Sequence, residues 1–208
     1  MSGAPLTLER DGDVGVLFLD APPRNVMGEP FFDALAAMTR DVLPGLDVAG
    51  LVVRGRGRHF SAGADVPRLC RLAASRAPDT LDVLAANSAA FTSLERLPYP
   101  TVAAIDGVCL GSGLELALAC RWRIATPSAL FASPEAEFGL IPGCGGSVRL
   151  PERIGTGAAL DLFLSARHLD AEEAFRLGLV DALLPRADLG PAASRLVRRL
   201  ALQEGRAA

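Results

Sequence analysis

Two carboxylates with the spacing and surroundings of proton-transfer groups lie 20 residues apart, at Glu115 and Glu135. Glu115 stands inside the apolar segment GLELALAC, where burial is expected to raise its pKa. Glu135 lies between a proline and the glycine-rich turn 139–146. A pair of this kind can move protons on neighbouring carbons of a bound substrate. The structural alternative makes Glu115 a partner of a helix dipole and Glu135 a loop residue.

Two glycine-containing loops supply candidate donors for negative charge on that substrate. They are Ser61–Asp65 (SAGAD) and Gly111–Gly113 (GSG). The small residues allow close approach of main chain to a ligand, and the second loop opens a helix whose first N–H groups lack intrahelical partners. Such loops suit an oxyanion or a phosphate. A nucleotide-phosphate site is the weaker interpretation, because neither a Walker lysine nor a G-x-G-x-x-G after a strand is present.

The hydrophobic pattern around these loops predicts alternating strands and helices. We expect strands at residues 14–20, 50–55, 101–105 and 179–185, with two short strands between 122 and 132. We expect helices at 29–42, 79–96, from 114, before 150, at 156–166, after the Asp170/Glu173 capping box, and at 191–202. The inner face of the 79–96 helix is predicted to carry Leu81, Leu84, Ser88 and Phe91. This alternation predicts an α/β fold with mostly parallel pairing.

Composition and charge bear on whether the protein binds nucleic acid or phosphate. Half of the 208 residues are hydrophobic and the net charge is −3, which gives the molecule as a whole no electrostatic basis for binding nucleic acid. All 21 basic residues are arginines. Residues 54–76 hold six of them, Arg54, Arg56, Arg58, Arg68, Arg71 and Arg76, against the single acid Asp65. This stretch is either a phosphate-facing patch or a solvated surface.

The remaining sequence signals favour a cytoplasmic protein. The four cysteines, at 70, 109, 120 and 144, show no metal-binding spacing and are expected to be reduced thiols. Cys144 has no nearby histidine, and neither His59 nor His168 has a spaced partner. The N-terminal segment lacks the apolar region of a signal peptide, and no apolar run is long enough to span a membrane.

Four ordered motifs resemble those of the enoyl-CoA hydratase/isomerase family, the crotonase superfamily. They read GRHFSAGADV, AAIDGVCLGSGLELALAC, FASPEAEFGLIPGCGGSVRLPERIG and LSARHLDAEEAFRLGLVDALLP. The resemblance covers about residues 6–186. It implies a spiral of ββα units in a core at 1–186, followed by a shortened C-terminal helical region at 187–208. It further implies an acyl-CoA substrate, no metal or redox cofactor, and a homotrimer or a hexamer built as a dimer of trimers.

The resemblance also assigns roles to individual residues. It places the oxyanion hole at the backbone N–H groups of Ala62 and Ser112, and the two catalytic acids at Glu115 and Glu135. The implied CoA contacts are Arg24, Ala62, Gly63, Ala64, Asp65 and Gly111, with Arg58 as a further candidate. From the residue type alone, Asp65 is instead expected to fix its loop by accepting backbone hydrogen bonds.

The implied reaction is syn addition of water to a trans-2-enoyl-CoA, giving a 3-hydroxyacyl-CoA. Glu115 would activate the water and Glu135 would protonate C2. The alternatives are an enoyl-CoA isomerase or a thioester decarboxylase of the same fold, acting on CoA or on a carrier-protein-bound chain, and a non-catalytic scaffold that binds acyl thioesters. Two departures from the family pattern bear on these expectations: Ser112 stands where glycine is common, and the segment after Asp188 has room for one helix only.

Overall fold

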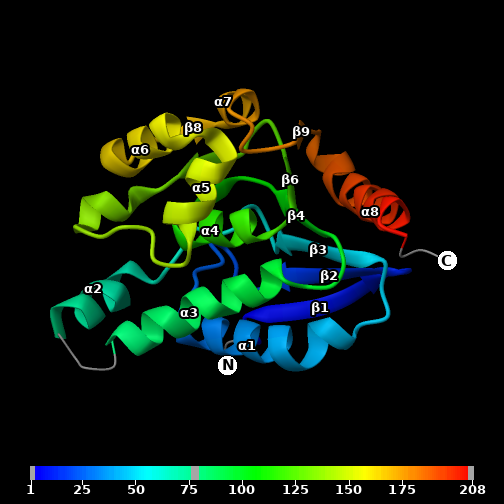
Figure 1. Cartoon of the computed structure of the whole chain (residues 1–208), viewed down its shortest axis with the longest axis horizontal. Coiled ribbons are helices and arrows are strands. Elements are labelled where there is room, and N and C mark those ends of the chain that lie inside the picture. The colour runs from blue at the N-terminus through cyan, green and yellow to red at the C-terminus, as the bar shows by residue number, and fades with distance from the viewer. Residues whose placement is uncertain (1–2, 76–79, 206–208) are drawn as a thin grey trace.

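A six-stranded sheet organises the chain, with one apolar core on each of its faces (Figure 1). The computed structural model describes residues 3–75 and 80–205. In spatial order the strands are β1 (Leu6–Asp11), β2 (Val14–Leu19), β3 (Gly50–Gly55), β4 (Thr101–Ile105), β6 (Trp122–Ala125) and β9 (Ala182–Leu183). β1 pairs antiparallel with β2 and the other pairs are parallel. The predicted α/β class with mostly parallel pairing is confirmed.

Alternation along the strands sends side chains to both cores. Leu17, Leu51 and Val53 face the larger core, whereas Val16 and Val52 face the smaller one. Because successive side chains of a strand point to opposite faces, strands buried on both sides are apolar throughout. The larger core is covered by α1 (Glu29–Ala37), α3 (Thr80–Glu95) and α4 (Ser112–Ala119), and the smaller core by α8 (Arg186–Gln203).

A second, three-stranded sheet lies beyond the carboxyl end of β4. Its spatial order is β5 (Val108–Leu110), β7 (Leu130–Ala132) and β8 (Leu169–Asp170). The remaining helices are α2 (Val66–Ser75), α5 (Gly146–Ile154), α6 (Thr156–Ser165) and α7 (Ala171–Arg176), with a 3₁₀ segment at Pro134–Phe138. The path β4–β5–α4 brings the predicted glycine loop to the start of a buried helix, as the sequence indicates.

Most predicted helices and strands are present, and α1, α3 and α8 differ from the prediction in their bounds or in their buried face. The first helix continues past Ala37 as a π-helical turn, Met38–Val42, because the Thr39 hydroxyl donates to the carbonyls of Leu35 and Ala36. α8 begins at Arg186 rather than at Pro191. The predicted inner face of α3 is correct at Phe91, which is fully buried, and wrong at Leu81, which is 76% exposed. The predicted cap at residue 79 lies outside the described residues.

Four elements are absent from the sequence-based prediction: β1, α2, β5 and β8. β5 has three residues and β8 has two, so neither produces a readable alternation. β1 is an edge strand with mixed burial. α2 follows directly on the small residues of the first loop, and Asp65 begins it by accepting a hydrogen bond from the Arg68 N–H at 3.1 Å. The expected structural role of Asp65 is thereby confirmed.

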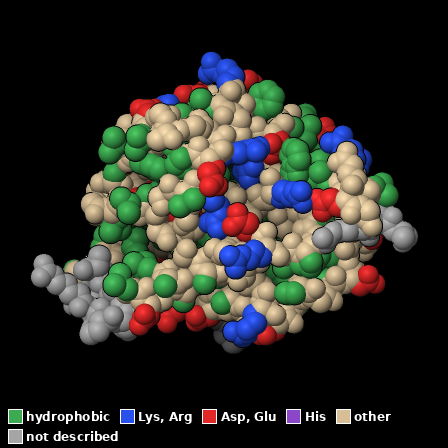
Figure 2. Space-filling model, viewed as in Figure 1, with side chains coloured by type: hydrophobic (Ala, Val, Ile, Leu, Met, Phe, Trp, Pro, Cys, Tyr) green, Lys and Arg blue, Asp and Glu red, His purple; other side chains and the backbone are tan. Residues whose placement is uncertain are grey.

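Exposed apolar side chains gather on the side of the molecule that carries α5, α6 and the segment before them, at the left in Figure 2. They are Phe138, Ile141, Val148, Leu160 and Leu164. Within the described ranges, none of the helices combines the length and apolar character that a membrane span requires.

One buried cation on β6 holds the end of α4 to the segment that precedes β9. Arg123 is 3% exposed, and its side chain donates to the Leu179 carbonyl at 2.8 Å and to the Ala117 carbonyl at 3.3 Å. Its guanidinium also lies 3.9 Å from the Asp181 carboxylate. The carbonyls at the end of the helix would be left without these donors if Arg123 were removed.

We therefore expect Arg123→Met to lower the free energy of unfolding by about 3 kcal/mol, the usual cost of breaking a buried charged network. The urea unfolding midpoint measures this loss. The matched control is Arg121→Met, whose side chain is exposed and should cost less than about 1 kcal/mol. Equal midpoints for the two variants would contradict the role assigned to Arg123.

Candidate active site

A cavity of about 460 Å³ opens between α2, α3, α4 and the segment 134–144. Its volume lies in the range of small-molecule sites. The wall is mainly apolar, and five of the six predicted CoA contacts line it together with both predicted acids. The polar and loop residues on the wall are Ala62, Gly63, Ala64, Asp65, Arg68, Asn87, Gly111, Ser112, Glu115 and Glu135.

A short parallel bridge brings the two glycine loops together. Ser61 pairs with Cys109: its N–H donates to the Val108 carbonyl, and its carbonyl accepts from the Leu110 N–H, both at 3.0 Å. Gly63 has φ +87°, and a Cβ there would lie 2.6 Å from the Leu110 carbonyl oxygen and 3.4 Å from the Ser112 nitrogen. Only glycine permits this approach, so the contact between the loops is a direct consequence of the SAGAD and GSG motifs.

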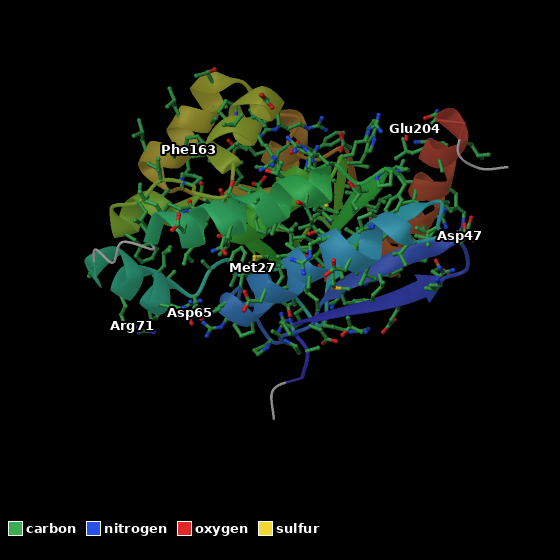
Figure 3. All side chains as sticks on the ribbon, turned by 60° about the horizontal axis from the view of Figure 1, so that its bottom comes forward. Met27, Asp47, Asp65, Arg71, Phe163 and Glu204 are labelled. Carbon is green, nitrogen blue, oxygen red and sulfur yellow. The ribbon has the colours of Figure 1, made fainter. Side chains whose placement is uncertain are left out.

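The structure corrects one of the predicted oxyanion donors. The Ala62 N–H donates to the Arg24 carbonyl at 2.8 Å, so it is engaged within the protein and the prediction of Ala62 is wrong. Met27 donates to the Gly63 carbonyl, and the Asp65 N–H donates to the Met27 carbonyl. Met27 and Asp65 are labelled in Figure 3.

Ala64 is the residue between these two hydrogen bonds, so its own N–H points away from Met27 and toward the cavity that it lines. Among the described residues, no acceptor is bound to the N–H of Ala64 or of Ser112. Ser112 is the first residue of α4, where the helix dipole adds positive potential. The donor pair that the geometry offers is therefore Ala64 and Ser112.

Glu115 is held at the start of α5 by two backbone amides. The Cys144 and Gly146 N–H groups donate to Oε1 of Glu115 at 2.7 and 2.9 Å. A Cβ on Gly146 would lie 2.8 Å from Glu115 Cγ, so this position accepts no side chain without displacing the carboxylate. The small residues of the GCGG turn thus allow the backbone to approach Glu115. The second carboxylate oxygen of Glu115 remains for other partners.

The pKa of Glu115 is raised to about 7, chiefly by burial, and the charge of the Glu135 carboxylate acts in the same direction. The amides of Gly146 and Cys144 and the Ser112 hydroxyl act in the opposite direction, since they favour the ionised form. The side chain is 3% exposed. A carboxyl that titrates near neutral pH can both accept and release a proton under ordinary conditions.

Glu135 lies on the 3₁₀ segment with its carboxylate beside the glycine loop. Its Oε2 accepts a hydrogen bond from the Ser133 hydroxyl at 2.8 Å, and its Oε1 would lie 3.1 Å from a Cβ on Gly111. Burial raises the pKa of Glu135, while the hydrogen bond from Ser133 opposes this shift. The two acids therefore reach the same cavity from α4 and from the chain segment after β7.

The glycine-loop residues among the predicted CoA contacts reach the cavity, and the two arginines do not. Gly63, Ala64, Asp65 and Gly111 line the cavity, whereas Arg24 and Arg58 are exposed and lie outside its wall. The Arg24 contribution seen here is its carbonyl, which holds the first loop.

The arginine-rich stretch is not a single phosphate-facing patch. Arg56 pairs with Glu9 and Asp20 and lies over the Phe18 ring, whereas Arg68 pairs with Glu29 at 2.6 Å. These acids lie on β1, directly after β2 and on α1, far from the arginines in the sequence. Arg76 lies outside the described residues.

Sequence reasoning missed the groups that hold Glu115. The sequence predicts only a reduced thiol at Cys144; the thiol is buried, and the Cys144 N–H is one of the two donors to the carboxylate. Arg149 fixes the same turn, because it donates to the Cys144 carbonyl at 2.9 Å and to Glu95 on α3 at 2.8 Å. A glycine-rich turn placed directly before a helix is the signal that could have indicated an amide site.

The described residues contain four free cysteines and no group of three or more His, Cys, Asp or Glu side chains arranged to hold a metal ion. His59 accepts a hydrogen bond from the Val108 N–H at its Nδ1 atom, which makes it part of the β5 connection.

The two linked sheets, the converging amide loops and the paired acids define the crotonase fold, which solved relatives share. A Thermobifida fusca protein described as a candidate enoyl-CoA hydratase and solved with acetoacetyl-CoA has a TM-score of 0.84 and 31% identity. The match covers 96% of this chain and 81% of that one. The family model for enoyl-CoA hydratase/isomerase matches residues 9–208. The chain belongs to the enoyl-CoA hydratase/isomerase family, and the resemblance seen in the motifs is confirmed.

Curated relatives agree with this assignment. The Mycobacterium tuberculosis protein named "Probable enoyl-CoA hydratase EchA17" is 36% identical over 190 residues, which are 91% of this chain and 72% of that protein. The alpha subunit of the fatty acid oxidation complex of Shewanella halifaxensis is 39% identical over 189 residues. That match covers 86% of this chain and 26% of the subunit, so the chain spans about a quarter of the length of this relative.

The buried position of Glu115 predicts a pH-dependent cost to stability. Its folded-state pKa, about 7, is above the ordinary value of 4.5, so stability is fully present below pH 4.5 and declines as the pH rises through 7. Glu115→Gln removes this titration and keeps an oxygen for the two amides. We expect the variant to gain up to about 3 kcal/mol over the wild type between pH 4.5 and pH 8.

Urea unfolding of both proteins across this pH range measures the difference. The control is Glu137→Gln, which alters an exposed carboxylate two residues from Glu135. A stability difference between Glu115→Gln and wild type that stays constant with pH would show that Glu115 is not held in a raised-pKa environment.

Proposed function

We propose that this protein is an enoyl-CoA hydratase, which adds water to a trans-2-enoyl-CoA to give a 3-hydroxyacyl-CoA. The observation that carries the proposal is one cavity that contains two unpaired amide donors and two acids with raised pKa. An isomerase needs to move only one proton between carbons, whereas addition of water requires one group to activate the water and another to protonate C2. The complex of the Thermobifida fusca relative with acetoacetyl-CoA supports an acyl-CoA substrate.

In the proposed reaction the thioester oxygen accepts hydrogen bonds from the Ala64 and Ser112 N–H groups. Water lies between the two carboxyl groups, and ionised Glu115 removes one of its protons while the oxygen bonds to C3. The C2–C3 double-bond electrons move toward the thioester, and the two amides stabilise the resulting enolate oxygen. Glu135 then delivers its proton to C2. Glu115 ends protonated and Glu135 ionised, and one proton exchange with solvent restores the starting state.

The wider expectations belong to the same proposal. The reaction uses only groups of this chain, with CoA as part of the substrate, in the cytoplasm. The assembly is a homotrimer or a hexamer, and the exposed apolar side chains on α5 and α6 support association of copies. Activity on a carrier-protein-bound chain is the alternative to free CoA.

The first test replaces each acid in turn. Glu115→Gln and Glu135→Gln should each lower kcat by roughly 10² to 10⁴ with little change in affinity, because a proton-transfer group is lost while the shape of the site is kept. The measurement is turnover of a short 2-enoyl-CoA with identification of the product. Double-bond migration without a 3-hydroxyacyl product would identify an isomerase, and equal turnover in all three proteins would support the scaffold.

The second test removes one N–H at a time. Exchange of the Ala64 backbone amide for an ester should lower kcat by about 10² to 10³, the usual effect of losing one oxyanion donor. The same exchange at Ala62 removes the hydrogen bond to Arg24 and should reduce stability rather than kcat. A larger loss of kcat at Ala62 than at Ala64 would restore the original prediction for Ala62.

A further inference from the structure

Asn87 places an amide on an otherwise apolar section of the cavity wall. It lies on α3 with Val83 and Leu84, one turn away, and all three line the cavity. Residues three and four positions apart share a helix face, so the pattern of this face calls for an apolar residue at position 87. Leu69 and Phe32 continue the apolar wall from α2 and α1. The acyl chain of a thioester bound at α4 would run along this wall.

The amide of Asn87 differs from the other polar side chains of the wall because it has no partner in the protein. The others are Asp65, Arg68, Ser112, Glu115 and Glu135, and each is hydrogen-bonded or ion-paired. Across residues 3–75 and 80–205, no hydrogen bond reaches the side chain of Asn87. It is half-buried and lines the cavity, so its amide is free to bond a ligand there.

The energetic consequence depends on the ligand. A plain hydrocarbon chain would remove water from the amide without replacing its hydrogen bonds, at a cost of about 1–3 kcal/mol. A hydroxyl or keto oxygen on the part of the acyl chain that faces Asn87 would replace the lost hydrogen bonds to water, since an amide both donates and accepts. A carboxylate is less suitable, because Arg68, the cation among the described residues of the wall, is already paired with Glu29, and Asp65 lies on the same wall.

We propose that Asn87 selects 2-enoyl thioesters whose acyl chain carries a neutral oxygen, a hydroxyl or a keto group, beyond the reacting carbons. This inference rests on the proposed hydratase function and names the substrate class for that site.

The experiment compares trans-2-octenoyl-CoA with the same chain bearing one hydroxyl group at each carbon from the fifth to the eighth. For the wild type, kcat/KM for the best hydroxylated substrate should exceed that for the plain chain by about fivefold to tenfold, the value of one net hydrogen bond. Asn87→Leu should reverse this preference. Ala85→Leu places the same leucine side chain at an exposed position of α3 outside the wall and should behave as the wild type.

The measured quantity is a ratio of kcat/KM values within one protein, so partial misfolding of a variant does not change it. A wild type that hydrates the plain chain at least as well as every hydroxylated chain would overturn the inference, as would equal ratios for Asn87→Leu and Ala85→Leu. These results leave the hydratase proposal standing. Failure of the wild type to hydrate any of these substrates or crotonyl-CoA would overturn the proposed function, and the inference with it.

Discussion

The arrangement of the site depends on one buried carboxylate, Glu115, which is held beside two backbone amides. Burial opposes its ionised form, and the Cys144 and Gly146 N–H groups at the start of α5 favour it, so the pKa comes to about 7. This balance requires a glycine at 146, since a Cβ would occupy the place of the carboxylate. It also requires the turn to be rigid, which Arg149 provides by linking it to α3. The acid is therefore set by the packing of α3, α4 and α5 together.

The second sheet positions the two backbone amides, as the packing of α3, α4 and α5 positions the acid. β5 is short, yet it continues the chain from β4 and pairs with Ser61, which fixes the level of the two donor loops. The N–H of Ala64 faces the cavity because its neighbours are bonded to Met27, and the N–H of Ser112 does so because it begins α4. Both acids and both amide donors thus line one cavity. Under the proposed function the thioester binds there, with its acyl chain along the apolar wall from α1 to α3.

The sequence allowed the class of fold to be predicted, and it singled out Glu115, Glu135 and Ser112, which the structure brings to one cavity, because each lies within a local motif of glycines and apolar residues. It did not show that the Ala62 N–H is engaged and the Ala64 N–H is not, because this depends on a bridge to Met27 and on the Arg24 carbonyl, about 40 residues earlier. The pairing of Arg56 and Arg68 with acids on other elements was likewise invisible in the chain order. α2 was missed although it lines the cavity, because the preceding loop obscured its start.

The central claim is that the Ala64 and Ser112 amides meet at one substrate atom beside the two acids. A crystal structure of the protein with a bound acyl-CoA tests this claim most directly. The account predicts a thioester oxygen at roughly 2.7–3.2 Å from both nitrogens, the usual range for such hydrogen bonds, with the second and third acyl carbons facing Glu115 and Glu135. A thioester oxygen bound to neither amide, or an acyl chain that leaves the cavity away from the acids, would contradict it.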